Sequence, residues 1–150
     1  MAISLENTLV GVAGEYLVAG ELSLRGHLAS ITLRNSRGID ILVSNADASK
    51  TVSIQVKTNS NGNPSWLLNQ KAEQFFSNEH FYVFVAIEHI GIRPRYYIVP
   101  SEVVAEHVRT SHSNWLKGKK LDDSPRKDTS MRKFTDFENA FLERWDLLPL

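Results

Sequence analysis

Hydrophobic residues at the start of the chain recur at the three- and four-residue spacing of one face of an α-helix. Ser4 is placed to cap this helix, and Gly26 ends it. The side predicted to face the core comprises Leu5, Leu9, Val12, Tyr16, Ala19 and Leu24. Gly11 and Gly14 lower the helix propensity, which indicates close packing against a neighbouring element.

Three short runs of aliphatic and β-branched residues follow the helix and predict three strands, over residues 28–33, 39–43 and 51–56. The segments between them, residues 35–38 and 45–49, are rich in Asn, Ser, Asp and Gly, which is typical of turns. We therefore expect the three strands to form a meander.

The middle of the chain returns to longer apolar segments after a polar loop over residues 59–65. Residues 66–76 are expected to form a short helix. Residues 81–87 predict a buried strand, and residues 96–99 predict its hairpin partner.

The last third of the chain predicts mainly helices and loops. Ser101 can cap a helix that runs to about residue 116, and residues 117–133 contain few large apolar side chains and predict an exposed loop. Thr135 and Glu138 have the spacing of a capping box before a last helix. The residues expected to pack from these two helices are Val104, Val108, Trp115, Phe141, Leu142 and Trp145.

This order of elements predicts an α/β or α+β domain, with a mixed sheet of about five strands flanked by helices. A chain of 150 residues has the usual length of one domain, so residues 1–150 are expected to form a single unit with a C-terminal helical extension over about residues 101–150.

The composition excludes several classes of site. The chain has no cysteine, which rules out disulfides, a thiolate zinc site and a thiol nucleophile. Neither a signal peptide nor a membrane-spanning run is visible, so we expect a cytoplasmic protein. Lys plus Arg equals Asp plus Glu, 17 of each, so the net charge provides no long-range attraction to nucleic acid.

Candidate chemistry lies on two of the predicted strands. Because side chains alternate along a strand, Gln55 and Lys57 share the face opposite to the aliphatic residues. Asp40 lies on the corresponding face of the preceding strand, near its start. If these two strands pair as an antiparallel hairpin, Asp40 and Lys57 are neighbours.

An aspartate, an amide oxygen and a lysine in one place are the parts that metal-assisted phosphodiester hydrolysis needs. Mg²⁺ prefers oxygen ligands, which Asp40, the Gln55 side chain and the Val56 carbonyl could supply. Lys57 would orient the attacking water or offset the charge that develops on the phosphate. Two alternatives remain open: Gln55 and Lys57 could form a solvated strand face, or Lys57 could form a purely structural ion pair with Asp40.

The sequence resembles the PD-(D/E)XK nuclease superfamily over roughly residues 5–99. The resemblance rests on Gly14-Glu15, on the segment from Arg37 to Val43 that contains Asp40, and on Ile54-Gln55-Val56-Lys57. It implies a restriction-endonuclease-like core of helix, three-stranded meander, helix and strand. It also implies an active site made of Glu15, Asp40, Gln55 and Lys57. Glu21 is a weaker candidate for the helix glutamate.

One position departs from the family pattern. Gln55 stands where an acidic residue is usual, which removes a negative charge and weakens metal binding, but Gln-x-Lys resembles the Mrr-type restriction endonucleases. The resemblance therefore implies a nuclease that uses Mg²⁺ or Mn²⁺, with DNA as the expected substrate and a homodimer as a further expectation. The alternatives are an inactive module of the same fold that binds nucleic acid or protein, and a small interaction protein whose polar strand face is incidental.

Basic residues cluster in the loop predicted over residues 117–133. Contacts to nucleic-acid phosphates are expected from Lys117, Lys119, Lys120, Arg126, Lys127, Arg132 and Lys133. Trp115 or Trp66 could stack on a base. The alternative is a solvated loop beside two core tryptophans.

Overall fold

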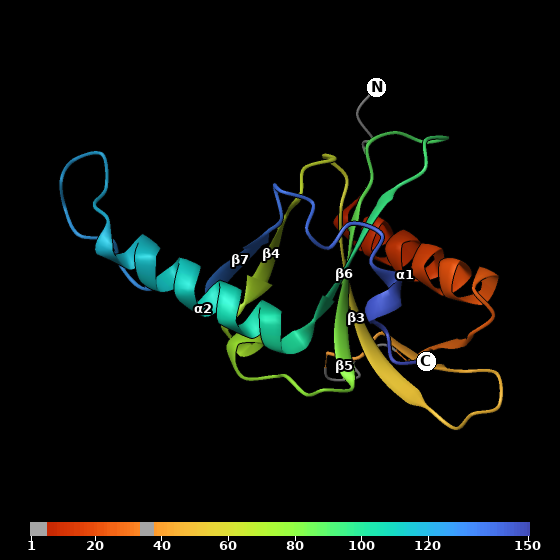
Figure 1. Cartoon of the computed structure of the whole chain (residues 1–150). Helices are drawn as coiled ribbons and strands as arrows, with labels where there is room; N and C mark the ends of the chain where they lie inside the picture. Colours follow the sequence, from red (N-terminus) through yellow and green to blue (C-terminus); the bar gives the residue numbers. More distant parts are fainter. Residues whose placement is uncertain (1–5, 34–37) are drawn as a thin grey trace.

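A five-stranded mixed sheet forms the centre of the molecule (Figure 1). The computed structural model describes residues 6–33 and 38–150. The strands are β1 (Leu28–Ile31), β2 (Ile41–Ser44), β3 (Thr51–Asn59), β5 (His80–Ala86) and β6 (Arg95–Pro100), and they lie in the order β1-β2-β3-β5-β6. Only the pairing of β3 with β5 is parallel among these neighbours. The predicted α+β class with a mixed sheet of five strands is therefore confirmed.

Helix α1 (Asn7–Leu24) covers one face of the sheet, together with the 3-10 helix η2 (Trp145–Leu147) near the C-terminus. The largest hydrophobic cluster lies between these layers. It includes Val18, Leu22, Ile41, Val43, Val52, Ile54, Val56, Phe81, Val83, Val85, Tyr96 and Ile98. The aliphatic side of β3 thus points toward α1, and its polar side points away from it.

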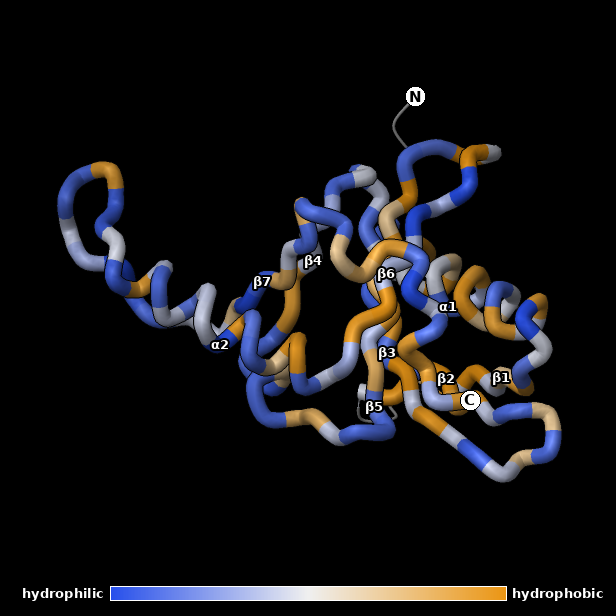
Figure 2. Tube along the Cα trace, viewed as in Figure 1, coloured by the Kyte–Doolittle hydropathy of each residue, from blue (hydrophilic) through white to orange (hydrophobic). Residues whose placement is uncertain are grey.

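The face of α1 that packs on the sheet differs from the predicted one. Its buried residues are Val10, Gly14, Val18, Glu21 and Leu22. By contrast, Leu9 is 53%, Tyr16 68% and Leu24 84% exposed. The helix is apolar on most of its surface, as the orange turns of α1 in Figure 2 illustrate. Spacing alone therefore could not decide which apolar face is buried.

Two glycines determine how closely α1 packs on the sheet and where the helix ends. A Cβ added to Gly14 would lie 1.7 Å from Thr58 Oγ1, so Gly14 allows a close approach to β3, whereas one added to Gly11 would meet nothing within 4 Å. The prediction of close packing is therefore right for Gly14 and wrong for Gly11. Gly26 ends the helix at a φ of 85°, with the N–H groups of Gly26 and His27 bonded back to the last turn. The predicted cap Ser4 lies outside the described residues.

The other face of the sheet is covered by α2 (Ser101–Lys117), the 3-10 helix η1 (Gln70–Glu73) and a two-stranded antiparallel sheet of β4 (Ser65–Asn69) and β7 (Met131–Thr135). A second hydrophobic cluster fills this space. It comprises Trp66, Leu68, Ala72, Tyr82, Phe84, Ala86, Tyr97, Val99, Val104, Val108 and Phe134. The C-terminal end of α2 and the loop that follows it project away from the sheet, on the left of Figure 1. We call this segment, about residues 111–128, the arm.

The helix predicted over residues 66–76 is wrong. Most of this segment is strand β4 followed by η1, because Trp66 and Leu68 alternate with exposed neighbours and β4 pairs with β7. Trp66 is buried, and its indole N–H donates to the Val85 carbonyl at 2.9 Å. Pairing with β7, which lies more than sixty residues later in the chain, therefore favours a strand over a helix for this segment.

The α-helix predicted near the C-terminus is also wrong, since the segment after α2 forms loops, β7 and the three-residue 3-10 helix η2. Thr135 is the last residue of β7, and the Asp136 carboxylate accepts hydrogen bonds from the Ala140 and Phe141 N–H groups at 2.9 Å each. These bonds hold a turn instead of a helix.

Helix α2 agrees with its prediction except for its cap and its last apolar residue. Ser101 is the first helical residue, and its hydroxyl bonds to the Ser77 backbone instead of capping α2. Trp115 is 41% exposed and does not join the core. In the described part of the chain, none of the helices is long and apolar enough to cross a membrane.

Candidate functional site

The pairing of β2 with β3 brings Asp40 beside the second half of β3. Ile41 pairs with Ile54, so Asp40, directly before β2, stands opposite Gln55. The Asp40 N–H donates to the Ile54 carbonyl at 2.8 Å. In return, the Val56 N–H donates to Asp40 Oδ2 at 2.7 Å. The carboxylate is thus held against the strand that carries Gln55 and Lys57.

The Val56 carbonyl points toward the same place. The N–H and C=O groups of one strand residue project to the same side of the strand, as they do in a hydrogen-bonded antiparallel pair. Because the Val56 N–H reaches the Asp40 carboxylate, the Val56 carbonyl also projects to the β2 side. Two oxygen-bearing groups, one of them a carboxylate, therefore meet at this point.

The surroundings of Asp40 disfavour its charged form. Burial raises the pKa of the Asp40 carboxyl above its usual value, while the hydrogen bond from Val56 and the positive charge of Lys57 act in the opposite direction. Burial is the largest of these effects, so the hydrogen bond and the lysine offset the loss of water only in part.

A cleft opens on the polar side of β3, away from α1. It encloses about 660 Å³ and is lined by Gly38, Gln55, Lys57, Leu68, Asn69, Lys71, Ala72, Gln74, Phe75 and Tyr82. Lysines and amides line this cleft, and there is no carboxylate among these residues. Its charge therefore favours an anionic ligand.

Gly38 shapes the rim of the cleft. It has a left-handed φ of 64°, and an added Cβ would lie 3.2 Å from the Phe75 ring and 3.6 Å from Gln55 Oε1. The absence of a side chain therefore lets the chain before Asp40 pass close to both groups. Residues 34–37, including Arg37 of the family motif, lie outside the described residues.

Glu15 belongs to the helix that packs on the same end of β3 from the opposite layer. It is half-buried in α1, and its neighbour Gly14 touches Thr58, the residue after Lys57. Asp40, Gln55, Val56 and Lys57 thus lie together, whereas Glu15 lies on the α1 side of the sheet. Its role as a site residue stays a prediction.

Glu21, the weaker candidate, belongs to a different cluster. Its carboxylate, 10% exposed, bonds with Arg93 and, at 2.6 Å, with Arg25. Arg93 also pairs with Glu143 at 2.9 Å. The hydrogen bond from Arg93 lowers the pKa of Glu21 below its usual value, and the bond from Arg25 adds to this. Glu21 is fully occupied by these pairs and ties α1 to the β5–β6 loop and the C-terminal segment.

The donor set near Asp40 suits a hard divalent cation in kind. One carboxylate, one side-chain amide oxygen and one backbone carbonyl are all oxygen ligands, as Mg²⁺ prefers. Over residues 6–33 and 38–150, no group of three or more His, Asp or Glu side chains is positioned to hold a metal ion. A metal here would therefore depend on neutral oxygens for most of its protein ligands.

Some residues around the site were not predicted. Ser53 shares the polar side of β3 with Gln55, and its hydroxyl lies 2.7 Å from Nδ1 of the buried His80. Burial lowers the pKa of His80 to about 4, so this histidine is neutral at ordinary pH. The alternation of β3 could have identified Ser53. Lys71 and Phe75 carried no such signal, because their segment was predicted as a helix.

The basic residues of the C-terminal third fall into two groups. Arg132 is only 7% exposed and pairs with Glu73 at 2.5 Å, so the predicted phosphate contact is wrong for this residue. Arg126 is engaged by Trp115, since its guanidinium lies 5.1 Å from the ring and donates to the Trp115 carbonyl at 2.7 Å.

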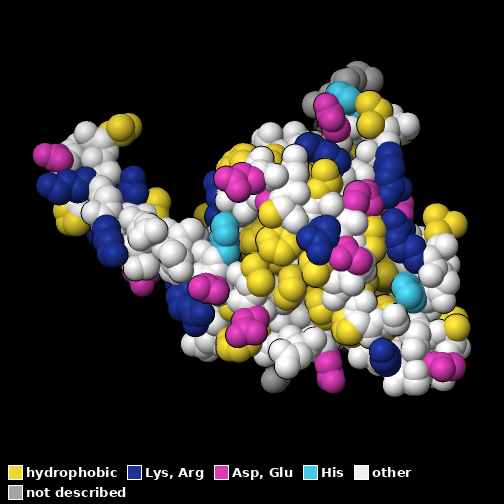
Figure 3. Space-filling view, in the orientation of Figure 1, with side chains coloured by type: hydrophobic (Ala, Val, Ile, Leu, Met, Phe, Trp, Pro, Cys, Tyr) yellow, Lys and Arg dark blue, Asp and Glu magenta, His cyan; other side chains and the backbone are white. Residues whose placement is uncertain are grey.

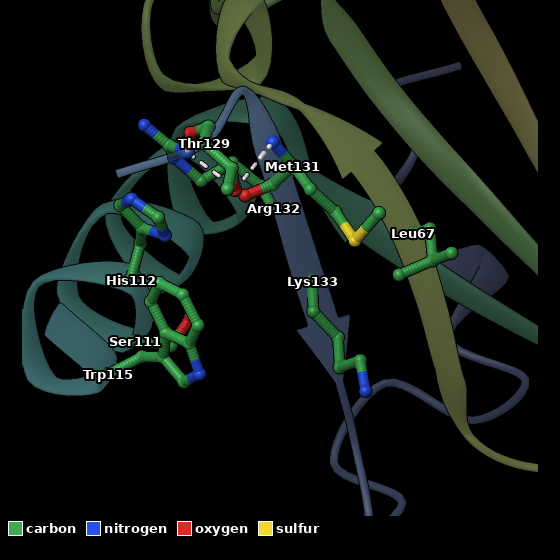
Figure 4. A pocket seen from close by; sticks show the side chains of 8 residues that line it. All are labelled: Leu67, Ser111, His112, Trp115, Thr129, Met131, Arg132 and Lys133. Atoms are coloured by element: carbon green, nitrogen blue, oxygen red, sulfur yellow. Dashed lines mark hydrogen bonds between the residues drawn. The ribbon is translucent and has the colours of Figure 1, made fainter. Parts of the chain in front are cut away.

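The remaining basic residues lie on the projecting arm and beside it, where Figure 3 shows Lys and Arg side chains. The exposed ones are Lys117, Lys119, Lys120, Lys127 and Lys133. A hollow of about 320 Å³ adjoins the arm, and Figure 4 shows Trp115 and His112 from α2 facing Lys133 and Met131 from β7 across it. This surface is separate from the cleft that Gln55 and Lys57 line.

No family model and no curated protein matches this sequence. Among solved structures, the bacterial homing endonuclease I-Ssp6803I aligns with a TM-score of 0.58 and 12% identity, over 95% of this chain and 91% of its own. Hjc, a Holliday junction resolvase from the archaeal hyperthermophile Archaeoglobus fulgidus, aligns with a TM-score of 0.47 and 13% identity, over 84% of this chain and 88% of its own. The likeness to the homing endonuclease shows that the two chains share a fold.

Proposed function

We propose that the protein is a divalent-metal-dependent nuclease of the PD-(D/E)XK type that hydrolyses phosphodiester bonds in DNA. The observation that carries this proposal is the half-buried Asp40 carboxylate, held against β3 beside Gln55, the Val56 carbonyl and Lys57. The nuclease-type fold supports it, because the fold of an endonuclease is present over nearly the whole chain.

The energetics of Asp40 support a charged ligand at this point. A buried carboxylate without full compensation destabilises the folded protein, and here burial outweighs the hydrogen bond and the lysine. A bound cation would reverse this balance, because it favours the ionised form. The Gln55 amide and Val56 carbonyl are the further oxygens that would hold Mg²⁺ or Mn²⁺ beside Asp40. When bound, such a metal supplies an acidified water and neutralises charge on the phosphate.

Lys57 and the cleft that it lines are proposed to bind the phosphate groups of the DNA. Lys57 lines the cleft, where an ammonium group can bind a non-bridging phosphate oxygen and offset the negative charge that grows during attack. Lys71 lines the same cleft and would position the next phosphate of the strand. Glu15 is proposed as the second acidic residue, which would approach from the α1 side.

Gln55 supports the proposal that the site belongs to a Gln-x-Lys subgroup similar to the Mrr-type restriction endonucleases. A neutral ligand in place of a carboxylate reduces the local negative charge by one. Metal affinity should therefore be lower than in a site with two carboxylates on these strands. We accordingly expect activity at millimolar Mg²⁺ and stronger binding of Mn²⁺, in line with the general order of divalent-metal affinities.

The lysines of the arm are proposed to contact the DNA backbone away from the cleft. Lys117, Lys119, Lys120 and Lys127 are exposed, although Lys119 lies 3.9 Å from Asp123. Contacts of this kind read no sequence, and their contribution decreases steeply with added salt.

A cleavage assay tests the proposal. Labelled double- and single-stranded DNA are incubated with Mg²⁺ or Mn²⁺ and the wild type, Lys57→Ala or Lys50→Ala. Lys50 is a matched control because it is an exposed lysine at the opposite end of the same strand pair. Lys57→Ala should reduce the cleavage rate about 100-fold or more, as the loss of one group that stabilises a charged transition state does, and Lys50→Ala should cleave like the wild type. Intact DNA with the wild type in both metals would contradict the proposal.

A second candidate is an inactive module of the same fold that binds nucleic acid or a protein partner. Gln55 favours it specifically, because the missing carboxylate is the change that would accompany loss of catalysis. This candidate predicts that DNA binds equally well in EDTA and in Mg²⁺ and remains intact. An anisotropy titration with a labelled duplex under both conditions separates the two candidates.

A further inference from the structure

Helix α1 has a second apolar face that nothing in the described chain covers. Successive positions along this face are four, three, four and four residues apart, which keeps them on one side of a helix. They are Leu9, Ala13, Tyr16, Gly20 and Leu24, and we call them the outer stripe. Leu9, Tyr16 and Leu24 are each more than half exposed. A helix that is apolar on both sides normally has partners on both sides.

The outer stripe is symmetric about its centre. Its residues alternate in size as large, small, large, small, large, and this order reads the same in either direction. If a second copy of α1 lies antiparallel, Leu9 meets Leu24 of the second copy, Ala13 meets its Gly20, and the Tyr16 residues meet near the two-fold axis. In a two-fold symmetric contact one patch pairs with a copy of itself, and this arrangement places the apolar residues of the outer stripe opposite one another.

A hollow at one end of the outer stripe adds a second match. It is lined by Tyr16, Leu17, Gly20, Glu21, Ser23, Leu24 and Tyr96, and its surface is mostly apolar. In the antiparallel arrangement this end of α1 faces the Leu9 end of the second copy. The Leu9 side chain of the second copy would then pack beside Leu24 at this hollow, where Gly20 adds no side chain.

Charge presents no obstacle to this contact. None of the five residues of the outer stripe is charged, and the whole chain has 17 basic and 17 acidic residues. Two copies can therefore approach without long-range repulsion.

The available area fits a weak dimer. Leu9, Tyr16 and Leu24 together expose on the order of 450 Å² per copy at the fractions given above, so two copies would bury roughly 900 Å² before the small residues are counted. Specific interfaces begin near 1,000 to 1,200 Å² in total, roughly the size that the whole stripe reaches.

We propose that the outer stripe of α1 is the contact surface of a symmetric homodimer, in which two copies of this helix pack antiparallel. The expected dissociation constant is about micromolar. This inference does not depend on the nuclease activity, because it uses neither Asp40 nor any residue that lines the cleft beside Gln55 and Lys57. If both hold, the dimer carries two cleavage sites, one for each strand of a duplex.

The cysteine-free chain makes the geometry directly testable. Single-cysteine variants Tyr16→Cys, Leu9→Cys and Leu24→Cys are oxidised and separated on a non-reducing gel. Near the two-fold axis, Tyr16→Cys should form a disulfide-linked dimer alone. Leu9→Cys should not, because the two copies of residue 9 would be about 22 Å apart along the helix pair. An equal mixture of Leu9→Cys and Leu24→Cys should produce the linked dimer.

Sedimentation of the cysteine-free chain provides the second measurement. The wild type should shift from monomer to dimer between about 1 and 100 μM, the range set by a micromolar dissociation constant. Tyr16→Glu should weaken the dimer at least tenfold, while Thr8→Glu, an exposed position on another side of α1, should leave it unchanged. A monomeric wild type throughout this range, a dimer insensitive to Tyr16→Glu, or equal linking by all three single-cysteine variants would overturn the proposal.

Discussion

Two carboxylates in contact with the central sheet have opposite surroundings, and the difference separates a structural cluster from a candidate active site. Glu21 lies between Arg25 and Arg93, and the bond from Arg93 lowers its pKa. Asp40 has one backbone N–H bond and a lysine nearby, and burial raises its pKa. Glu21 stabilises the fold as an ion, whereas ionised Asp40 lacks a full set of partners.

This contrast indicates which of the two carboxylates can still bind a cation. A carboxylate whose charge is already balanced by arginines has little to gain from a cation. A carboxylate that burial disfavours gains from any cation that reaches it, and the oxygens of Gln55 and Val56 lie beside Asp40 to share that cation. Asp40, whose charged form the fold disfavours, is therefore a better candidate for a functional residue than Glu21, whose charged form the fold stabilises.

The largest expected stability difference comes from neutralising each carboxylate in turn. Glu21→Gln removes the buried carboxylate that Arg25 and Arg93 share, which leaves Glu143 as their carboxylate partner. The substitution should lower the free energy of unfolding by about 2–3 kcal/mol. Asp40→Asn keeps an acceptor for the Val56 N–H and removes a disfavoured charge. It should therefore change stability by less than about 1 kcal/mol, or increase it. Urea unfolding in EDTA measures the free energy of unfolding of both variants. Equal decreases for the two variants would show that the surroundings of Glu21 and Asp40 do not differ in this way.

The contact of α1 with the site end of β3 gives a second expected difference. Gly14→Ala forces a Cβ into Thr58 and should lower the free energy of unfolding by about 1–3 kcal/mol. Gly11→Ala is the matched control, because its Cβ meets nothing within 4 Å, and it should raise stability by about 0.5–1 kcal/mol through better helix propensity. Thermal melts followed by circular dichroism suffice. A neutral Gly14→Ala would mean that α1 can shift away from β3.

The smallest expected effect is the opposite pH dependence of the two carboxylates. The lowered pKa of Glu21 means that its contribution to stability is present above the unfolded value and is lost as pH falls through the folded value. The raised pKa of Asp40 means that its contribution is present below the unfolded value and is lost as pH rises through the folded value.

In EDTA, the stability advantage of the wild type over Glu21→Gln should therefore decrease on acidification below about pH 4.5, near the ordinary pKa of glutamate. The stability of the wild type relative to Asp40→Asn should instead decrease as pH rises from about 3.8, the ordinary pKa of aspartate, through the raised pKa of Asp40. Unfolding curves at a series of pH values measure both. Slopes of the same sign would show that the two carboxylates have similar surroundings.

Much of the sheet could be predicted because its strands are fully apolar or alternate cleanly. The unbroken apolar run of β5 and the alternation of β3 gave correct strands, and the alternation also put Gln55 and Lys57 on one side. The position of Asp40 beside them followed from antiparallel pairing. Local sequence was sufficient where one strand borders the next along the chain.

The remaining features depended on contacts between distant segments. Trp66 and Leu68 lie in a strand because β7 pairs with β4, and β7 begins more than sixty residues later. Arg132 is buried because Glu73 is within reach, which no local pattern reveals. The buried face of α1 was missed for another reason: both of its faces carry apolar residues, and contacts such as that of Gly14 with Thr58 show which face packs on the sheet.

Calorimetric titration with Mn²⁺ tests the central claim about Asp40 most directly. The wild type should bind Mn²⁺ at a single site with measurable heat, and folded Asp40→Asn should show none. Glu21→Gln, measured at a temperature where it is folded, should bind like the wild type, because its carboxylate is not part of the site. Equal binding by the wild type and Asp40→Asn, or no binding by the wild type, would contradict the account of Asp40 as a metal ligand.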